Sequence, residues 1–304
     1  MTLTALEDVT RLSSRVIRVL AQNPGVGPLQ GTNTYVIGTG SRRLLVDTGD
    51  NPDQNTSANV KKYHELLQKE LGACNAKIDK ILLTHWHPDH TGGVEAILQS
   101  KHDLVCPGRN LITVSAGVEV MKFNCRRGED EQLPFTNKYT STLQDKQTVL
   151  TEGATLTVLY TPGHATDHAS LLLEEESVLF SGDCILGETS AIVEDLASYM
   201  QTLQSYLDLD KPVKKIFPGH GPVVEDGAAK IKEYINHRMK REHHIVDCLK
   251  TGPKTLEEIL ETVYVGLDQK LKLLALKNIE VHLQKLVNEH VVISESDNNL
   301  YRIV

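Results

Sequence analysis

The sequence lacks the cysteine pattern of a disulfide framework. Its five cysteines are odd in number and include no CxxC pair: Cys74, Cys106, Cys125, Cys184 and Cys248. Disulfide scaffolds use even sets of cysteines and belong to oxidising compartments. We therefore expect free thiols and a protein of a reducing compartment.

Long hydrophobic runs and a strong positive charge are also absent. No apolar run approaches the roughly 18 residues that cross a bilayer, so we expect no membrane partner. The first residues show no secretory pattern, and Glu7 and Asp8 count against a transit peptide. The net charge is -8, which argues against a chain coated in basic residues for duplex DNA but leaves room for a local basic strip.

The chain has 304 residues, of which 40% are hydrophobic and 24% are charged. This composition is typical of soluble globular proteins. This length suits one large domain followed by a small one. The character of the sequence changes after Pro222. We therefore place the large domain at residues 1–227 and the small, mostly helical domain at residues 228–304.

Strands and helices alternate irregularly in the large domain. Apolar periodicity predicts helices at Asn59–Leu71 and Glu194–Leu207, and strands at Arg15–Ala21, Asn33–Ile37, Arg43–Asp47, Thr155–Tyr160, Ala169–Leu173, Val178–Ser181 and Lys215–Phe217. Between Pro107 and Gln147 the periodicity fades, and the charged run at 126–132 is expected to be a solvated loop or the lip of a site. Because strict βαβ alternation is missing, this order favours a sandwich of two sheets with helices outside.

The densest cluster of chemically versatile residues is DKILLTHWHPDHTGG, at residues 79–93. His85 and His87 stand two apart after a short apolar strand, so both project from one side of an extended chain. Pro88 favours a helix start, so Asp89 and His90 would approach from a second direction. Imidazole and carboxylate groups suit Zn²⁺ or a similar divalent ion, and the two directions suit two neighbouring metals.

HWHPDH resembles the HxHxDH signature of the metallo-beta-lactamase superfamily. Three further motifs of that superfamily follow in order: YTPGHATDH with His164, LFSGDCILG with Asp183, and IFPGHGP with His220. The resemblance covers roughly residues 15 to 225, and four ordered motifs are far more specific than one. It implies a four-layer αββα sandwich with the ligands at strand ends along one edge.

The resemblance also implies two bound Zn²⁺ ions per chain. The ligands that it assigns are His85, His87 and His164 for the first ion, Asp89, His90 and His220 for the second, and Asp183 as the bridge. Manganese or iron stays open as the native metal because no thiolate ligand selects zinc. Water between two such ions ionises near neutral pH, which favours hydrolysis by a bridging hydroxide, with Asp89 and Asp183 as catalytic residues.

Four other residues near these motifs have candidate roles. Asp47, in VDTG, matches the first motif of the superfamily and would steady the HWHPDH loop. Asn33 either points its amide at the substrate or serves a turn. His168, four residues after His164, either supports the ligands or packs in the core. Cys184, beside the bridging Asp, is expected to be a buried small hydrophobic residue rather than a ligand.

The small domain has the pattern of three helices and a hairpin. The predicted elements are helices at Ala228–Lys250, Thr255–Val263 with a capping signature, and Leu271–Glu289, and a hairpin around Asp297–Asn299. The first helix holds six Lys or Arg against three acidic residues, and we expect His237, His243 and His244 on its solvated face. The order resembles a winged-helix domain, which binds nucleic acid in some proteins and serves as a packing or dimer module in others. A second copy of the chain, in a homodimer, is therefore one candidate partner.

The metal ligands alone do not choose a substrate. The short separation of Asp183 and His220 leaves no room for the inserted cap of the beta-CASP nucleases. Over nearly the whole chain, the motifs resemble those of zinc-dependent endoribonucleases of this superfamily that cleave single-stranded RNA, which implies the mitochondrial matrix, with the cytoplasm as the alternative. The low aromatic content, 5%, would make base stacking weak and sequence preference low. Two alternatives stay open: a thioesterase of the hydroxyacylglutathione hydrolase kind, and a non-catalytic, metal-stabilised nucleic-acid-binding module.

Overall fold

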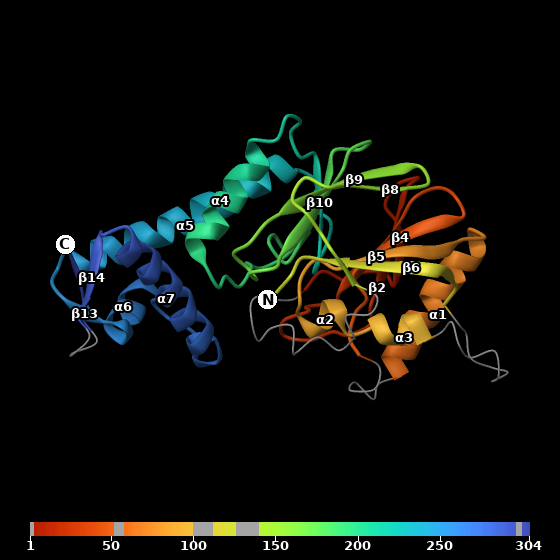
Figure 1. Cartoon of the computed structure of the whole chain (residues 1–304). Coiled ribbons are helices and arrows are strands. Elements are labelled where there is room, and N and C mark those ends of the chain that lie inside the picture. The colour runs from red at the N-terminus through yellow and green to blue at the C-terminus, as the bar shows by residue number, and fades with distance from the viewer. Residues whose placement is uncertain (1–2, 52–57, 100–111, 126–139, 296–299) are drawn as a thin grey trace.

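The computed structural model describes residues 3–51, 58–99, 112–125, 140–295 and 300–304. Within these ranges two sheets face each other with helices outside them, and a smaller domain of helices lies to one side (Figure 1). None of the helices described is both long and apolar enough to cross a membrane.

The first sheet combines antiparallel and parallel strands in the order β1–β2–β3–β4–β5–β6–β7. These strands are β1 (Val9–Arg11), β2 (Val16–Leu20), β3 (Asn33–Ile37), β4 (Arg42–Val46), β5 (Lys77–Leu82), β6 (Val114–Lys122) and β7 (Thr140–Thr142). Pairs up to β4 are antiparallel, and pairs from β4 onward are parallel. Side chains alternate between the two faces: Leu44 and Val46 face the second sheet, whereas Leu45 faces the outer helices.

The second sheet has the order β12–β11–β10–β9–β8. Its strands are β8 (Thr148–Thr151), β9 (Ala154–Tyr160), β10 (Ala169–Leu173), β11 (Val178–Gly182) and β12 (Lys215–Pro218). All pairs are antiparallel except β11–β12. This parallel pair brings the carboxyl ends of both strands to one edge, where Asp183 and His220 follow.

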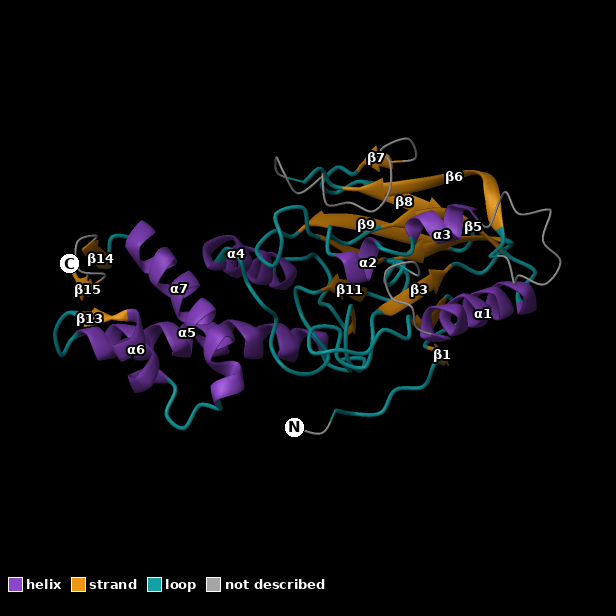
Figure 2. Ribbon diagram, turned by 90° about the horizontal axis from the view of Figure 1, so that it is seen from below, coloured by secondary structure: helices purple, strands orange, loops and turns teal. Residues whose placement is uncertain are grey.

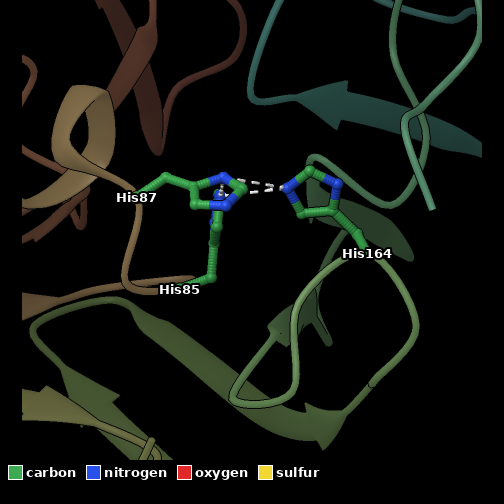
Figure 3. Close-up of side chains that lie close together, drawn as sticks. All are labelled: His85, His87 and His164. Carbon is green, nitrogen blue, oxygen red and sulfur yellow. Dashed lines mark hydrogen bonds between the residues drawn. The ribbon is translucent and has the colours of Figure 1, made fainter. Parts of the chain in front are cut away.

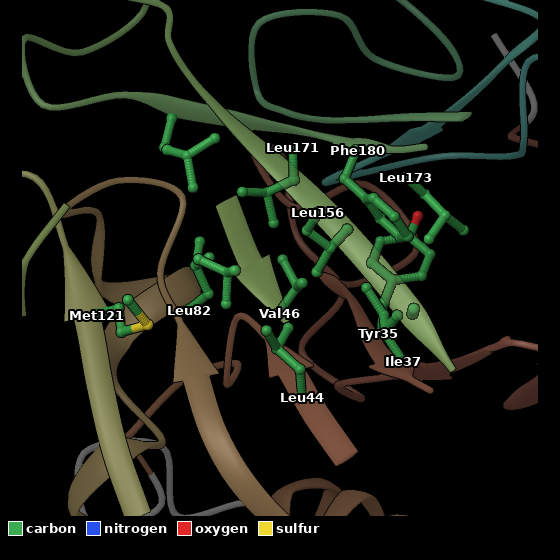
Figure 4. Packing of buried hydrophobic residues seen from close by; sticks show 14 of the residues in the cluster. Tyr35, Ile37, Leu44, Val46, Leu82, Met121, Leu156, Leu171, Leu173 and Phe180 are labelled. Carbon is green, nitrogen blue, oxygen red and sulfur yellow. The ribbon is translucent and has the colours of Figure 1, made fainter. Parts of the chain in front are cut away.

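The core between the sheets is apolar and includes stacked aromatic rings (Figure 4). Tyr35 meets Phe180 edge-on with 5.0 Å between ring centroids and stacks on Phe217 at 5.8 Å. Such pairs contribute about 0.5–1.5 kcal/mol beyond their buried area. The Tyr35 hydroxyl donates to the carbonyl oxygen of Pro218 at 2.7 Å. The buried ring therefore also holds the backbone that leads to His220.

Helices cover the outer face of each sheet (Figure 2). They are α1 (Ala58–Ala73), α2 (Pro88–Thr91) and α3 (Val94–Gln99) beside the first sheet, and α4 (Leu196–Leu207) and α5 (Gly227–Leu249) beside the second. Tyr63, Leu67 and Leu71 of α1 pack on the first sheet at helical spacing, as their periodicity predicts. The predicted αββα sandwich is confirmed.

The small domain follows as helices with a short sheet. Its elements are α6 (Leu256–Val263), α7 (Lys272–Asn288), β13 (Lys254–Thr255), β14 (Val292–Glu295) and β15 (Leu300–Ile303). Thr255 and Glu258 form the predicted capping box, and β14 pairs with β15 as the predicted hairpin. The hairpin turn at 296–299 lies outside the described residues. The domain boundary at 227 stays a prediction, since α5 contributes side chains to the cores of both domains.

The segment 107–147 differs from the expected irregular loop. It contains β6 and β7, which extend the first sheet by parallel pairing. The alternation of β6 ends at Met121 and Lys122, and the small residues Ala116 and Gly117 weaken its strand propensity, so the sequence indicates this strand only weakly. Strand pairing comes instead from neighbours far away in the chain. The charged run at 126–132 lies outside the described residues.

Candidate metal centre

The fold brings the four motifs to one edge of the sandwich. His85 follows the end of β5, and His87 precedes α2, which begins at Pro88 as predicted. The first turn of α2 then presents Asp89 and His90. The remaining motif residues follow other strands: His164 after β9, Asp183 after β11 and His220 after β12. All seven predicted ligands therefore meet, although they come from segments far apart in the chain.

Three imidazoles converge in the first cluster (Figure 3). His85 Nε2 lies 2.9 Å from His87 Nδ1, and His164 Nε2 lies 3.2 Å from both atoms. Zinc–nitrogen bonds of 2.0–2.1 Å in a tetrahedral site place neighbouring nitrogens about 3.3 Å apart. The spacing of this cluster therefore fits three ligands around one cation.

The second cluster combines two imidazoles with a carboxylate. His220 Nε2 lies 3.2 Å from His90 Nε2 and 3.2 Å from Asp89 Oδ2. Asp183 lies between the two clusters, with Oδ1 at 3.3 Å from His220 Nε2 and Oδ2 at 3.8 Å from His164 Nε2. One carboxylate oxygen therefore faces each cluster, as a bridging ligand requires.

Charge and burial at the edge also suit a cation. Burial lowers the pKa of His85 well below its ordinary value, and lowers that of His87 to about 4, which keeps both rings neutral as ligands must be. Burial opposes charge on His220 too, but contact with Asp183 outweighs it and raises the pKa of His220 to about 9. A cation bound there would take the place of that proton.

Asp47 supports the motif loop from the end of β4. One of its oxygens, Oδ2, accepts hydrogen bonds from His90 Nδ1 at 2.7 Å and from the Thr84 hydroxyl at 2.9 Å. The other, Oδ1, accepts from the Thr84 backbone N–H at 2.8 Å, and the Thr84 hydroxyl lies 3.0 Å from His85 Nδ1. Asp47 also has a φ of 58°, a left-handed conformation that is uncommon outside glycine but that Asp adopts more readily than most residues. A buried carboxylate thus orients two imidazoles, the arrangement expected of a support for metal ligands.

His168 and Asn33 lie behind the ligands and are buried. His168 Nε2 accepts the backbone N–H of Asp183 at 3.2 Å, and its Nδ1 contacts Thr161 Oγ1 at 2.8 Å. Asn33 Nδ2 donates to the carbonyl oxygens of Pro218 and Gly221, each at 2.9 Å. Both amide hydrogens of Asn33 therefore hold the turn around His220 instead of pointing at a substrate.

Other groups that sequence patterns did not reveal also support the metal ligands. His164 Nδ1 lies 2.8 Å from the carbonyl oxygen of Ile192, and carbonyl groups leave no signal in a sequence. A buried ion pair of Lys122 and Asp167 braces the loop between His164 and His168. Its only sequence signal is the position of Asp167 within the TPGHATDH motif. A Cβ at Gly219 would lie 2.4 Å from Asp183 Oδ1, so this position requires glycine.

Cys184 is buried and contributes to none of the ligand clusters among the described residues. Burial raises the pKa of its thiol to about 12, so the thiol stays protonated at neutral pH. A protonated thiol is a poor metal ligand because metals bind the thiolate. The geometry thus fits the interpretation of Cys184 as a small core residue.

Comparisons with known proteins agree with this geometry. Residues 27–220 match the metallo-beta-lactamase superfamily, and residues 255–301 match the beta-lactamase associated winged helix domain. A protein named beta-lactamase-like protein 2 homolog from Caenorhabditis elegans is 40% identical over 95% of this chain and 90% of its own length. A protein named atrochrysone carboxyl ACP thioesterase from Cryptosporiopsis is 33% identical over 97% of this chain and 86% of its own.

A solved structure shows the same fold. A metallo-beta-lactamase family protein from Thermus thermophilus is 24% identical and matches with a TM-score of 0.68, over 97% of this chain and 100% of its own. This chain therefore combines the αββα sandwich, a winged-helix domain and His/Asp clusters able to bind metal ions. The chain belongs to the metallo-beta-lactamase superfamily, whose members are typically hydrolytic enzymes.

Proposed function

We propose that this protein is an endoribonuclease that cleaves single-stranded RNA at a centre of two Zn²⁺ ions. The observation that carries the proposal is the adjoining position of two ligand clusters with Asp183 between them. When bound, two such ions would supply an ionised water and neutralise charge on a phosphodiester. An ionised water beside two cations favours hydrolysis of a charged ester such as a phosphodiester.

The ligands on the α2 side would orient the reactants. His87 and Asp89 are half-buried whereas the other ligands are buried, so substrate would approach past these two. Burial opposes ionisation of Asp89, but contact with His90 and His220 outweighs it and lowers the pKa of Asp89. Asp89 would therefore stay ionised and orient the attacking water by accepting a hydrogen bond.

Exposed basic residues on α5 would guide the RNA backbone. Lys232 and Lys240 are exposed, and so are His237, His243 and His244, as expected. Arg241, another basic residue of α5, is only partly exposed. Its guanidinium stacks on the Tyr264 ring at 3.9 Å and donates to the carbonyl oxygen of Val263 at 3.1 Å.

The decisive experiment offers two substrates to the zinc-loaded protein. Labelled single-stranded RNA and, separately, thioesters of glutathione and of pantetheine are incubated with the wild type and with Asp183→Asn. Cleavage of RNA by the wild type alone supports the proposal. Turnover of a thioester without RNA cleavage overturns it, and hydrolysis of neither substrate would favour a non-catalytic module.

The contribution of α5 can be measured by salt dependence. For single strands, each lost phosphate contact lowers the slope of log affinity against log salt by about 0.7. The double variant Lys232→Gln with Lys240→Gln should therefore bind RNA more weakly with a shallower slope. Lys61→Gln with Lys69→Gln on α1 is the matched control, because it changes the charge equally at exposed positions elsewhere. Equal slopes in the two double variants would remove α5 from the RNA site.

A thioesterase is the second candidate. The observation that favours it is the likeness, over nearly the whole chain, to a fungal protein named as an acyl-carrier thioesterase. The same ligand set could polarise a thioester carbonyl. The side chain of Ile192 is exposed, and the carbonyl oxygen of the same residue orients His164. This side chain therefore offers an apolar surface near the centre for an acyl group.

Two further expectations belong to the proposal. Metal analysis of protein purified without added metal should find two zinc equivalents per chain, and loss of RNA cleavage on chelation should be reversed by zinc. The endoribonuclease proposal also favours the mitochondrial matrix. Fluorescence microscopy of the tagged full-length protein tests that location against the cytoplasm.

A further inference from the structure

The segment between Cys184 and Asp195 lies against both the candidate metal centre and α5. The carbonyl oxygen of Ile192 accepts the hydrogen bond from His164 Nδ1. The backbone N–H groups of Glu194 and Asp195 donate to the carbonyl oxygen of Gly163, at 2.8 and 3.0 Å. The position and the ring orientation of His164 therefore depend on where this segment lies.

Arg238 of α5 holds this segment beside Ile192. Its Nη2 donates to the carbonyl oxygen of Ala191 at 2.6 Å, and its guanidinium lies 5.5 Å from the centroid of the Tyr199 ring. Arg238 is only 1% exposed, and its Nη1 has no hydrogen-bond partner among the described residues. Within the described ranges, these contacts of Arg238 are with a carbonyl oxygen and an aromatic ring and not with a carboxylate. Burying a guanidinium without a carboxylate partner is costly, so stability alone does not account for arginine at this position.

Tyr234, one helical turn earlier on α5, holds the beginning of the same segment. Its hydroxyl accepts the backbone N–H of Leu186 at 3.1 Å and lies 3.2 Å from the carbonyl oxygen of Thr189. Residues four apart on a helix lie on one face, so a single face of α5 holds both parts of the segment. α5 therefore supplies contacts at two points along the segment.

The other end of α5 is joined to the winged-helix domain. Arg241 contacts Val263 and Tyr264, and Glu242 forms an ion pair with Lys285 of α7 at 2.8 Å. Side chains of α5 further along belong to the core of that domain. One helix therefore connects the winged-helix domain to the segment that orients His164.

We propose that Arg238 is a positioning residue for the metal centre. By holding the carbonyl oxygen of Ala191, it places the neighbouring carbonyl oxygen of Ile192 where His164 Nδ1 must donate. This directs His164 Nε2 toward His85 and His87. The winged-helix domain thereby contributes to metal binding through α5. The inference rests on the proposed role of His164 as a metal ligand.

The test compares metal affinity in three full-length variants. Arg238→Met keeps the unbranched stem of the side chain and removes the guanidinium with its donors, Arg238→Lys restores one donor, and Asn236→Ala is the exposed control on the same helix. Loss of an outer partner of a metal ligand typically weakens affinity about 10–100-fold. We expect such a loss for one of two Co²⁺ equivalents in Arg238→Met, with an altered visible spectrum. Arg238→Lys should recover most of the affinity, and Asn236→Ala should match the wild type.

The outcomes separate this inference from the proposed function. A wild type that binds no metal would refute the metal centre itself. A folded Arg238→Met with wild-type affinity and spectrum would overturn the positioning role alone. If Arg238→Met does not fold, Tyr234→Phe decides, because it removes only a hydroxyl from the same helix face. A several-fold weaker Co²⁺ equivalent in Tyr234→Phe supports the inference, and unchanged affinity overturns it.

Discussion

The two halves of the candidate metal centre are supported by different means. On the first sheet, His85 and His90 are oriented by the side chains of Thr84 and Asp47. On the second sheet, His164 is oriented by the backbone carbonyl of Ile192 in a segment that α5 holds. A carboxylate increases the electron density on its imidazole, whereas a carbonyl mainly fixes the orientation of the ring. The first-sheet side therefore depends on side chains, and the second-sheet side depends on a backbone group that α5 helps to place.

The largest expected effect comes from Asp183, which lies between the two ligand clusters. Asp183→Asn keeps the shape of the side chain and removes the charge that faces both clusters. It should abolish hydrolysis and release at least one metal equivalent while circular dichroism stays unchanged, because the fold does not require this charge. Turnover and metal content are the measurements. Full activity in this variant would contradict a centre in which one carboxylate serves both clusters.

The next effect tests the side-chain-supported half. Asp47→Asn keeps a hydrogen-bonding group but removes the negative charge beside His90, so metal affinity should fall about 10–100-fold. Chelator competition measures the loss, and Asp210→Asn, at an exposed position, is the control. If Asp47→Asn bound metal as tightly as the wild type, the carboxylate would have no electronic role.

His282 on α7 offers a contrast to the imidazoles of the centre. It is buried, and neither ring nitrogen has a hydrogen-bond partner among the described residues. Burial, with Arg238 and Arg241 nearby, lowers its pKa to about 3. Below pH 6.5 the unfolded chain binds a proton that the folded chain does not, so stability falls as the pH falls. The loss at pH 5 relative to pH 8 should be about 2 kcal/mol.

The variant His282→Leu isolates this contribution. Urea unfolding of both proteins at pH 8 and pH 5 gives the change in free energy of unfolding, and contributions from all other groups cancel in the difference. The variant should lose less stability on acidification than the wild type, by about 2 kcal/mol. An equal loss in both proteins would mean that His282 takes up a proton in the folded state.

The smallest expected effect concerns the hydroxyl between Asp47 and His85. Thr84→Val replaces that hydroxyl by a methyl group of similar size, so the change is electronic and not steric. His85 keeps its place on the loop, and metal affinity should fall only several-fold, less than in Asp47→Asn. A loss as large as that of Asp47→Asn would show that Asp47 acts mainly through Thr84.

Prediction from the sequence worked best where a local pattern coincides with the final structure. Apolar spacing in 59–71 predicted α1, and Thr255 with Glu258 predicted the start of α6. It failed for β6, because Ala116 and Gly117 give a weak strand propensity and parallel neighbours far away in the chain decide the pairing. Arg241 is one of the six basic residues counted in the helix at 228–250, but its partners lie at the end of α6, which no local pattern reveals.

The sequence by itself determined which ligand types are available and the strand ends at which they occur. Four short motifs give the identity and the order of the ligands, because each motif places its imidazole or carboxylate groups at the end of a single strand. Only the tertiary structure decided how His164 is held. Its partner is a backbone carbonyl, which every residue possesses, and the helix behind that carbonyl lies far along the chain. A contact made by a group common to all residues leaves no pattern in a sequence, so it becomes visible only after folding.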